Sequence, residues 1–256
     1  MRYGVCILSI VPVRSNAGDS AEMTSQLLFG EVFKVHDVRL AWLKITMEHD
    51  DYSGWISSKQ WKEISLEEYE SINKTKQFSG ELLGLAQFSS PKEYSLISFG
   101  SPLPSFQDGK GELAKLNYSF SGEHILATQN KSLLTEYAFS LLNAPYLWGG
   151  RTPFGIDCSG FTQLLYRLID FKLPRDAYQQ AELGVALGFI AEAKAGDLAF
   201  FDNSEGKITH VGMLLENHQI IHASGCVRID SIDQTGIFDS KSNKYTHSLR
   251  IIRRIL

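Results

Sequence analysis

The sequence predicts an α+β fold in which small all-β domains precede a unit built from helices and a sheet. Short β-rich runs alternate with turn residues over residues 1–65, and residues 66–130 repeat this pattern. From residue 131 the pattern changes, because two helical stripes come first and three β-rich runs follow them. Helices followed by strands are typical of an α+β unit. We therefore expect three domains, over residues 1–65, 66–130 and 131–256.

The first domain is expected to be a small β-barrel. Turn clusters such as Asp50–Gly54 separate five short strands within about sixty residues. The second domain is expected to be another barrel of this kind or a linker domain. Runs with strand character include Val11–Arg14, Phe29–Val35, Arg39–Thr46 and Trp55–Ile56 in the first domain, and Tyr94–Phe99 and Leu113–Phe120 in the second.

The third domain begins with two amphipathic helices. Apolar residues follow one stripe of Lys131–Leu142, and Asn143–Pro145 ends that helix. In the second helix, apolar residues recur with helical spacing from Phe161 to Ile169, so the helix starts near Asp157–Gly160. Three strands are expected to follow: Asp197–Phe201, His210–Leu215 and Gln219–His222.

Composition and charge exclude several classes of protein. Of the 256 residues, 43% are hydrophobic, which suits a folded globular chain. The 25 basic and 29 acidic side chains give a net charge of −4, so no basic field is present to hold a nucleic acid. The acidic surplus lies in residues 1–130, which hold 12 basic and 16 acidic residues. The sequence has no apolar stretch long enough for a membrane-spanning helix.

The first seventeen residues allow two interpretations. Arg2 and the apolar run after it, with Ser15–Ala17 as a cleavage site, have features of a signal peptide. However, Ser9–Arg14 also has the pattern of a first β-strand that ends at a turn. We favour the strand and a cytoplasmic protein, with a secreted or periplasmic protein as the alternative.

A candidate nucleophile lies where the loop Trp148–Ile156 becomes the second helix. A helix N-terminus lowers the pKa of a thiol through its partial positive charge and free N–H groups, and Cys158 stands there. The same N–H groups can receive the oxyanion that forms when a carbonyl is attacked. A low-pKa thiol is expected to react with iodoacetamide at about pH 6. The alternative is a buried structural cysteine beside Asp157 as N-cap, and the local pattern leaves both open.

Two of the seven histidines are placed to serve a catalytic thiol as base. His210 and His222 lie on neighbouring β-rich runs joined by a short turn. If the turn has an odd number of residues, such as Glu216–His218, both side chains lie on one face at diagonal positions. One histidine can then orient the other, whereas a four-residue turn would put them on opposite faces. Surface roles are expected for the other histidines: His36, His49, His124, His218 and His247.

A metal site is the competing chemical interpretation. Its ligands would be Cys158, Cys226, His210 and His222, but their spacing matches no usual zinc motif, so no metal is expected. Cys226 and Cys6 are interpreted as small hydrophobic residues packed in strands.

Several motifs follow one another in the third domain. They are Pro145–Gly150, Asp157–Phe161, Gly196–Leu198 and His210–Gly212, with His222–Ala223 after them. Together they resemble the NlpC/P60 family of papain-like cysteine peptidases, over about residues 131–230. The resemblance implies helices packed on an antiparallel sheet. The β-rich region in front resembles bacterial SH3-like domains, and the combination is similar to the γ-D-glutamyl-L-diamino acid endopeptidases that trim murein peptides.

The resemblance implies a role for each matching residue. Cys158 corresponds to the nucleophile, His210 to the general base and His222 to the residue that orients the base. Tyr146 corresponds to a tyrosine whose hydroxyl helps to hold the oxyanion, with a ring packed in the core as the alternative. In the neighbouring loop, Gly149 and Gly150 are expected to permit a tight turn with Trp148 packed under it.

The resemblance also indicates substrate contacts. Asp157 corresponds to an acidic residue that contacts the free amine of the substrate, a role compatible with capping the helix. The segment Arg175–Ala177 corresponds to one beside the diamino-acid pocket, although Ala177 stands where serine is common. Glu22 and Tyr52 match positions that close the amine end of the cleft, with surface roles as the alternative. The candidate substrate-binding residues are thus Asp157, Ser159, Arg175, Asp176, Tyr52 and Glu22.

The implied substrate is a murein peptide, L-Ala-γ-D-Glu-diaminopimelate or a longer version with a free N-terminal amine. Hydrolysis would need no cofactor, and a monomer is favoured. Two other classes of function stay open. One is a peptidoglycan-binding protein whose catalytic domain is inactive, and the other is a related thiol amidase or acyltransferase that uses the same triad.

Overall fold

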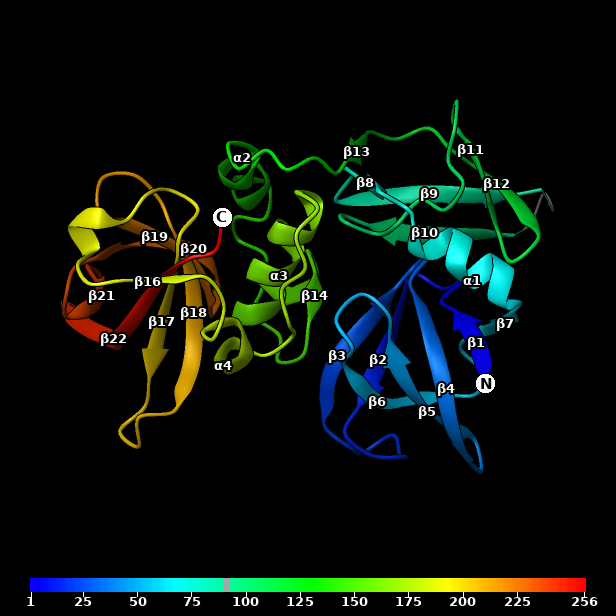
Figure 1. The fold of residues 1–256 in the computed structure, drawn as a ribbon, viewed down its shortest axis with the longest axis horizontal. Helices are drawn as coiled ribbons and strands as arrows, with labels where there is room; N and C mark the ends of the chain where they lie inside the picture. Colours follow the sequence, from blue (N-terminus) through cyan, green and yellow to red (C-terminus); the bar gives the residue numbers. More distant parts are fainter. Residues whose placement is uncertain (90–92) are drawn as a thin grey trace. The chain divides into compact units, whose positions relative to one another are not determined.

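The computed structural model describes residues 1–89 and 93–256, and the chain forms two compact units, Met1–Thr128 and Gln129–Leu256 (Figure 1). Residues 90–92, in the second predicted domain, lie outside the described residues. Within the described residues, no helix is long and apolar enough to cross a membrane.

The first unit begins with a seven-stranded antiparallel sheet in the order β3-β2-β6-β5-β4-β1-β7. Its strands are β1 (Arg2–Val5), β2 (Ile10–Arg14), β3 (Met23–Leu28), β4 (Val32–Arg39), β5 (Trp42–Met47), β6 (Ser53–Ser57) and β7 (Lys62–Ile64). Val11 and Val13 of β2 and the neighbouring Cys6 are fully buried in its hydrophobic cluster. Residues 1–17 therefore contribute two strands and part of a core, as expected for the strand interpretation of Ser9–Arg14.

The prediction of one strand over Phe29–Val35 is wrong, because the chain turns at Gly30. Gly30 has φ +78°, a left-handed conformation that favours glycine. The Glu31 carboxylate accepts a hydrogen bond from the N–H of Leu28 at 2.9 Å, which satisfies a backbone donor at the end of β3. Strand β4 begins only after this turn.

The rest of the first unit combines one helix with two small sheets. They are α1 (Leu66–Asn73), β8 (Gln77–Ser79), β9 (Leu83–Phe88), β10 (Tyr94–Ser98), β11 (Lys110–Leu113), β12 (Leu116–Phe120) and β13 (His124–Leu126). Sequence reasoning missed α1, although Ser65 and Glu68 form a capping box at its start. The predicted strand Leu113–Phe120 is a hairpin, since Ala114 and Lys115 both have positive φ.

One hydrophobic cluster joins residues from both predicted N-terminal domains. Val5 and Phe29 share it with Ile97 and Phe120, and Ser95 Oγ donates a hydrogen bond to the carbonyl of Ile7 at 2.8 Å. A cut after residue 65 would therefore expose apolar surface on both sides. The domain limits at residues 65 and 130 stay predictions about independent folding.

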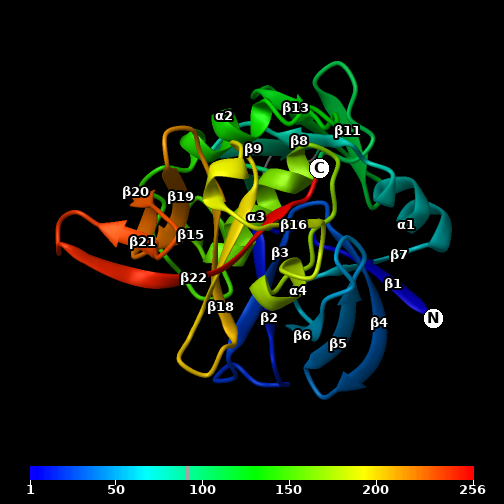
Figure 2. The ribbon, with the colours of Figure 1, turned by 60° about the vertical axis from the view of Figure 1, so that its left-hand side comes forward.

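The second unit consists of helices and an antiparallel sheet that closes on itself (Figure 2). The helices are α2 (Leu133–Ser140), α3 (Cys158–Leu168) and α4 (Ala177–Gln180), with a short 3₁₀ turn at Ile190–Glu192. The strands are β14 (Arg151–Thr152), β15 (Gly155–Ile156), β16 (Val185–Leu187), β17 (Leu198–Asp202), β18 (Ile208–Leu214), β19 (Gln219–Ser224), β20 (Cys226–Ile232), β21 (Gly236–Asp239) and β22 (Lys244–Arg254). The predicted helices and the three predicted strands are all present, within a few residues at their ends.

The large sheet has the order β16-β22-β17-β18-β19-β20-β21, and β21 also pairs with β22. This additional pairing closes six strands into a barrel. Helix α3 packs against β18 and β19. The α+β prediction is confirmed, and the packing brings the start of α3 to the strands that carry His210 and His222.

Candidate active site

Cys158 is the first residue of α3, and Asp157 caps that helix. Asp157 has extended backbone angles, and its Oδ1 accepts a hydrogen bond from the N–H of Gly160 at 2.7 Å. Its Oδ2 accepts one from the N–H of Gly149 at 2.9 Å, so the loop before the helix is tied to the cap. A side chain at Gly150 would place its Cβ 2.3 Å from the carbonyl oxygen of Gly155, so only glycine fits there. The predicted tight turn is confirmed.

Arg175 forms a buried bidentate ion pair with this capping carboxylate. The guanidinium donates from Nη1 to Asp157 Oδ1 at 3.0 Å and from Nη2 to Oδ2 at 2.6 Å. It also donates to Ser159 Oγ at 2.9 Å. The Arg175 side chain is 1% exposed and the Asp157 side chain 8%. These contacts give all three residues a structural role beside the thiol, and their predicted contacts with substrate stay predictions.

The thiol of Cys158 does not have the low pKa that its helix position predicts. Burial and, to a smaller extent, the neighbouring Asp157 carboxylate raise the pKa to about 12, against lowering effects from the backbone at Val211, from Arg175 and from the backbone at Ser159. The side chain is only 6% exposed, so the loss of water outweighs the helix N-terminus. The resting thiol is therefore protonated at neutral pH and needs a base when it attacks.

Alkylation of Cys158 by iodoacetamide should be slow at neutral pH and should accelerate with pH. A thiol pKa of about 12 leaves a thiolate fraction roughly a thousandfold below that of an unperturbed thiol. The rate constant, measured by mass spectrometry in a Cys226→Ser background, should rise about tenfold per pH unit between roughly pH 7 and 10. Cys6 is fully buried and does not compete. Fast alkylation that has already reached a plateau at about pH 6 would show that the thiolate is preformed.

The hairpin that carries the two histidines has the odd turn. Met213 pairs with Ile221 and Leu214 with Ile220, and the N–H of Leu215 donates to the carbonyl of Gln219 at 2.8 Å. The turn is therefore the three-residue segment Glu216–His218. His210 and His222 lie at diagonal positions on one face, and His210 Nε2 lies 2.8 Å from His222 Nδ1. The backbone of Val211, the residue after His210, interacts with Cys158, so the thiol lies beside this strand.

Sequence reasoning missed the carboxylate that extends this histidine pair. Asp230 on β20 lies diagonally across from His222, and its Oδ2 is 2.9 Å from His222 Nε2. Its other oxygen accepts a hydrogen bond from Arg228 at 2.6 Å. The sequence does place Arg228 and Asp230 two residues apart, on one face of a third strand. It does not show that this strand pairs with the strand of His222.

His247 was expected at the surface, and that prediction is wrong. Its ring stacks on the ring of His210, with centroids 4.2 Å apart and an interplanar angle of 27°. Burial, together with His222, lowers the pKa of His247 to about 4. Burial also lowers the pKa of His210 well below its ordinary value, with His222 and His247 acting in the same direction. His210 is therefore a neutral imidazole at neutral pH.

Tyr146 belongs to the same site, since its hydroxyl interacts electrostatically with Cys158 and Asp157. Its N–H donates to the carbonyl of Gly225 at 3.0 Å, and its backbone bridges to Ile156 just before the helix. Burial, and to a smaller extent the charges of Cys158 and Asp157, raise the pKa of Tyr146 to about 12. The phenol stays protonated and can donate a hydrogen bond. Trp148 is 59% exposed, so the prediction that it packs under the loop is wrong.

The remaining sequence-predicted residues are Asp176, which follows Arg175, and Glu22 and Tyr52 of the other unit. The N–H of Asp176 donates to Gln179 Oε1 at 3.2 Å at the start of α4. Glu22 and Tyr52 belong to Met1–Thr128, the unit that does not contain Cys158. Their role toward substrate stays a prediction. His49, which was expected at the surface, has a side chain only 14% exposed, with Nε2 3.3 Å from Asp50 Oδ2.

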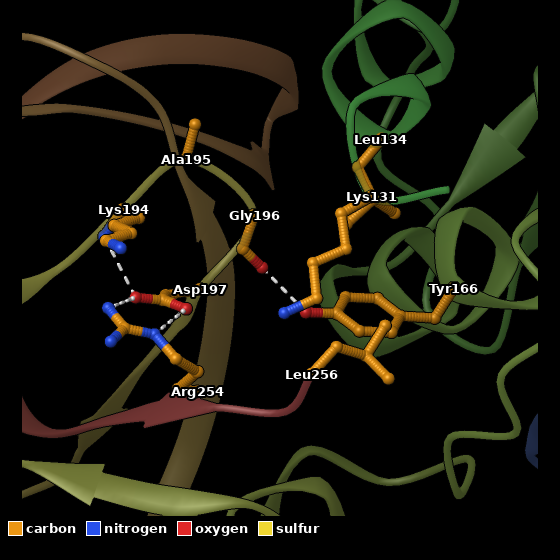
Figure 3. A pocket seen from close by; sticks show the side chains of 9 residues that line it. All are labelled: Lys131, Leu134, Tyr166, Lys194, Ala195, Gly196, Asp197, Arg254 and Leu256. Atoms are coloured by element: carbon orange, nitrogen blue, oxygen red, sulfur yellow. Dashed lines mark hydrogen bonds and ion pairs between the residues drawn. The ribbon is translucent and has the colours of Figure 1, made fainter. Parts of the chain in front are cut away.

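A pocket of about 130 Å³ lies at the start of β17 (Figure 3). Asp197 lines this pocket, and Phe201, which pairs with His210, comes four residues later in the chain. Four residues of strand separate Asp197 and Phe201 by about 13 Å. Arg254 donates to Asp197 at 2.7 Å, and the Tyr166 hydroxyl donates to the carbonyl of Gly196 at 2.6 Å. The pocket is thus separate from the histidine cluster. The Tyr166 contact joins α3 to the segment before β17, and the Arg254 contact joins β22 to that segment.

Comparisons with known proteins agree with this geometry. The NlpC/P60 family model matches residues 143–246, and a model for the SH3 domain of bacterial dipeptidyl-peptidases matches residues 13–60. The structure also resembles that of an NlpC/P60 family protein from Bacillus cereus, with a TM-score of 0.85, 20% identity and 99% of both chains covered. That likeness shows the shared fold.

Two curated relatives match most of the chain. A γ-D-glutamyl-L-lysine dipeptidyl-peptidase of Bacillus subtilis is 30% identical over 221 residues, 78% of this chain and 71% of that protein. A protein of the same name from Bacillus cereus is 26% identical, over 79% of this chain and 67% of that protein. With its catalytic-domain match, its SH3 domain and this relative, the chain belongs to the NlpC/P60 family of peptidases.

Proposed function

We propose that this protein is a cysteine peptidase that hydrolyses the bond between γ-D-glutamate and a diamino acid in murein peptides with a free N-terminal L-Ala. The observation that carries the proposal is the hydrogen-bonded pair His210–His222 on the strands that pack against the helix headed by Cys158. The names of the two curated relatives, γ-D-glutamyl-L-lysine dipeptidyl-peptidases, support the choice of the cleaved bond and of a dipeptide as the product.

In the proposed reaction, Cys158 Sγ attacks the γ-carbonyl carbon of D-Glu while His210 Nδ1 accepts the thiol proton. The oxyanion accepts hydrogen bonds from the N–H of Cys158 and the hydroxyl of Tyr146. Collapse of the tetrahedral intermediate breaks the C–N bond, and the His210 imidazolium gives its proton to the leaving amine. Water, deprotonated by His210, then hydrolyses the thioester and releases L-Ala-D-Glu. No cofactor takes part in these steps.

We propose Glu22 and Tyr52 as the residues that recognise the free amine, as the family pattern implies. The surplus of four acidic residues in residues 1–130 supports this assignment. Asp157 contributes less than the family pattern implies, because the guanidinium of Arg175 and two backbone N–H groups already occupy both of its oxygens. A free-amine requirement suits recycling of small peptides, and we place the enzyme in the cytoplasm.

Products formed from four tripeptides test the proposed function. L-Ala-γ-D-Glu followed by L-Lys or by diaminopimelate is offered with its N-terminus free or acetylated, and products are identified by mass spectrometry. We expect the dipeptide L-Ala-D-Glu and the free diamino acid from the unacetylated peptides, and at least about a hundredfold lower kcat/KM for the acetylated ones. Equal cleavage of both forms would refute recognition of the amine, and cleavage of none would refute the proposed substrate.

A further inference from the structure

Three ionisable groups of the site, His210, His222 and Asp230, are joined by hydrogen bonds, and Asp230 adds one to the predicted nucleophile, base and orienting histidine. His210, His222 and Asp230 lie on three consecutive strands of the barrel, each diagonal to the next. The hydrogen-bond distances are 2.8 Å from His210 Nε2 to His222 Nδ1 and 2.9 Å from His222 Nε2 to Asp230 Oδ2. Both histidine rings are buried, with His222 1% exposed. Each N–H in the hydrogen-bonded line His210–His222–Asp230, called the line below, therefore has a fixed partner.

The geometry points to Asp230 as a positioning residue that selects the tautomer in which His210 can accept the thiol proton. This inference rests on the proposed function of Cys158 and His210. Asp230 itself touches neither thiol nor substrate in this assignment, and it acts through His222.

The proton count follows from the acceptor at the end of the line. A carboxylate can only accept, so His222 carries a proton on Nε2; we assign its ring to the neutral form, in which Nδ1 is an acceptor. The facing Nε2 of His210 must therefore donate, which places the single proton of the neutral His210 ring on Nε2. Nδ1 of His210 is left with a free lone pair. If the end of the line were a donor, every proton would shift and His210 Nδ1 would be blocked.

Charged neighbours keep Asp230 ionised. Although burial raises its pKa, hydrogen bonds from His222 and Arg228 hold the pKa of Asp230 below its ordinary value. Arg228 also contacts Asp239 at 3.2 Å. The other ionisable group that faces this line is His247, with its ring centroid 5.8 Å from that of His222 and 4.2 Å from that of His210. His247 stacks on the ring of His210 and lies edge to face with that of His222, whereas Asp230 is hydrogen-bonded to His222 Nε2.

The substitution Asp230→Asn reverses the line while keeping its shape. The amide nitrogen of the new residue can donate to His222 Nε2, which moves a proton to Nδ1 of each histidine. In Ser-His-Asp triads the corresponding exchange costs about 10⁴ in kcat through the wrong tautomer. With one more histidine in between, we expect kcat to fall by at least about a hundredfold with KM within about threefold. The matched control is Asp239→Asn, because Asp239 contacts Arg228 but not His222. Its kcat and KM should both stay within about threefold of those of the unsubstituted protein.

Nitrogen-15 NMR of histidine-labelled protein provides the measurement that a merely structural role would not move. In the unsubstituted protein at neutral pH, His210 and His222 should both be protonated at Nε2 alone, and in Asp230→Asn both should be protonated at Nδ1. This spectrum needs no substrate, so it stands apart from any failure of the proposed function. A proton on His210 Nδ1 of the unsubstituted protein, alone or together with Nε2, would overturn the inference even if Asp230→Asn failed to fold. Unchanged kcat in a folded Asp230→Asn protein would overturn it as well.

Discussion

Replacing Cys158 by alanine is expected to lower kcat on the tripeptide by at least about ten-thousandfold. The thiol is the only group in the proposed reaction that forms a bond to the substrate, and removal of a nucleophile that acts as a unit with its base abolishes most of the rate enhancement. Since the side chain is small and 6% exposed, the fold should tolerate the change. The measurement is product formation by mass spectrometry, beside a thermal unfolding curve.

The matched control for this prediction is Cys226→Ala. Cys226 is a free, half-buried cysteine at the start of β20 with no role in the proposed reaction, and its loss should leave kcat within about twofold. The double variant Cys158→Ala/His210→Ala should be no slower than Cys158→Ala alone, because the base has no thiol to serve. A folded Cys158→Ala protein that retains a tenth of the activity would exclude Cys158 as nucleophile.

Replacing Asp157 by alanine is expected to destabilise the second unit by about 3–5 kcal/mol. The guanidinium of Arg175 is almost wholly buried and would lose both of its bonds to the carboxylate. The N–H of Gly160 would also lose its cap, a smaller cost of about 1 kcal/mol. Urea unfolding followed by hydrogen exchange of α3 amides reports on this unit separately from the first.

The double variant Asp157→Asn/Arg175→Met separates the ion pair from the cap. Asparagine keeps an acceptor for the N–H of Gly160, and methionine fills the buried space of the Arg175 side chain without a charge. This variant should recover most of the lost stability. If Asp157→Ala alone costs less than about 1 kcal/mol, the buried pair does not hold the start of α3.

Local patterns predicted the parts of the site that depend on neighbours in sequence. Asp157 before an apolar stripe predicts a capped helix with Cys158 in its first turn, and the chain folds that way because the cap satisfies N–H groups within three residues. The parity of a short turn similarly decides whether His210 and His222 share a face. These features need no knowledge of distant strands.

The residues that sequence reasoning missed depend on closure of the barrel. His247 reaches His210 only because β22 pairs with both β17 and β21, and nothing local distinguishes it from a surface histidine. The pKa of Cys158 was predicted in the wrong direction for a related reason, since burial arises from packing of α3 against β18 and β19. Tertiary packing therefore decides both the partners of the base and the charge of the nucleophile.

The central claim is that Cys158 attacks the γ-carbonyl of a murein peptide whose amine is free. A chloromethyl ketone built on L-Ala-γ-D-Glu places an alkylating carbon at that position and can be mapped by peptide mass spectrometry. We expect one adduct, on Cys158, formed at least about a hundredfold faster than with the N-acetylated reagent and prevented by excess tripeptide. Adducts on Cys226 or other residues, or equal rates with the free and acetylated reagents, would contradict this account.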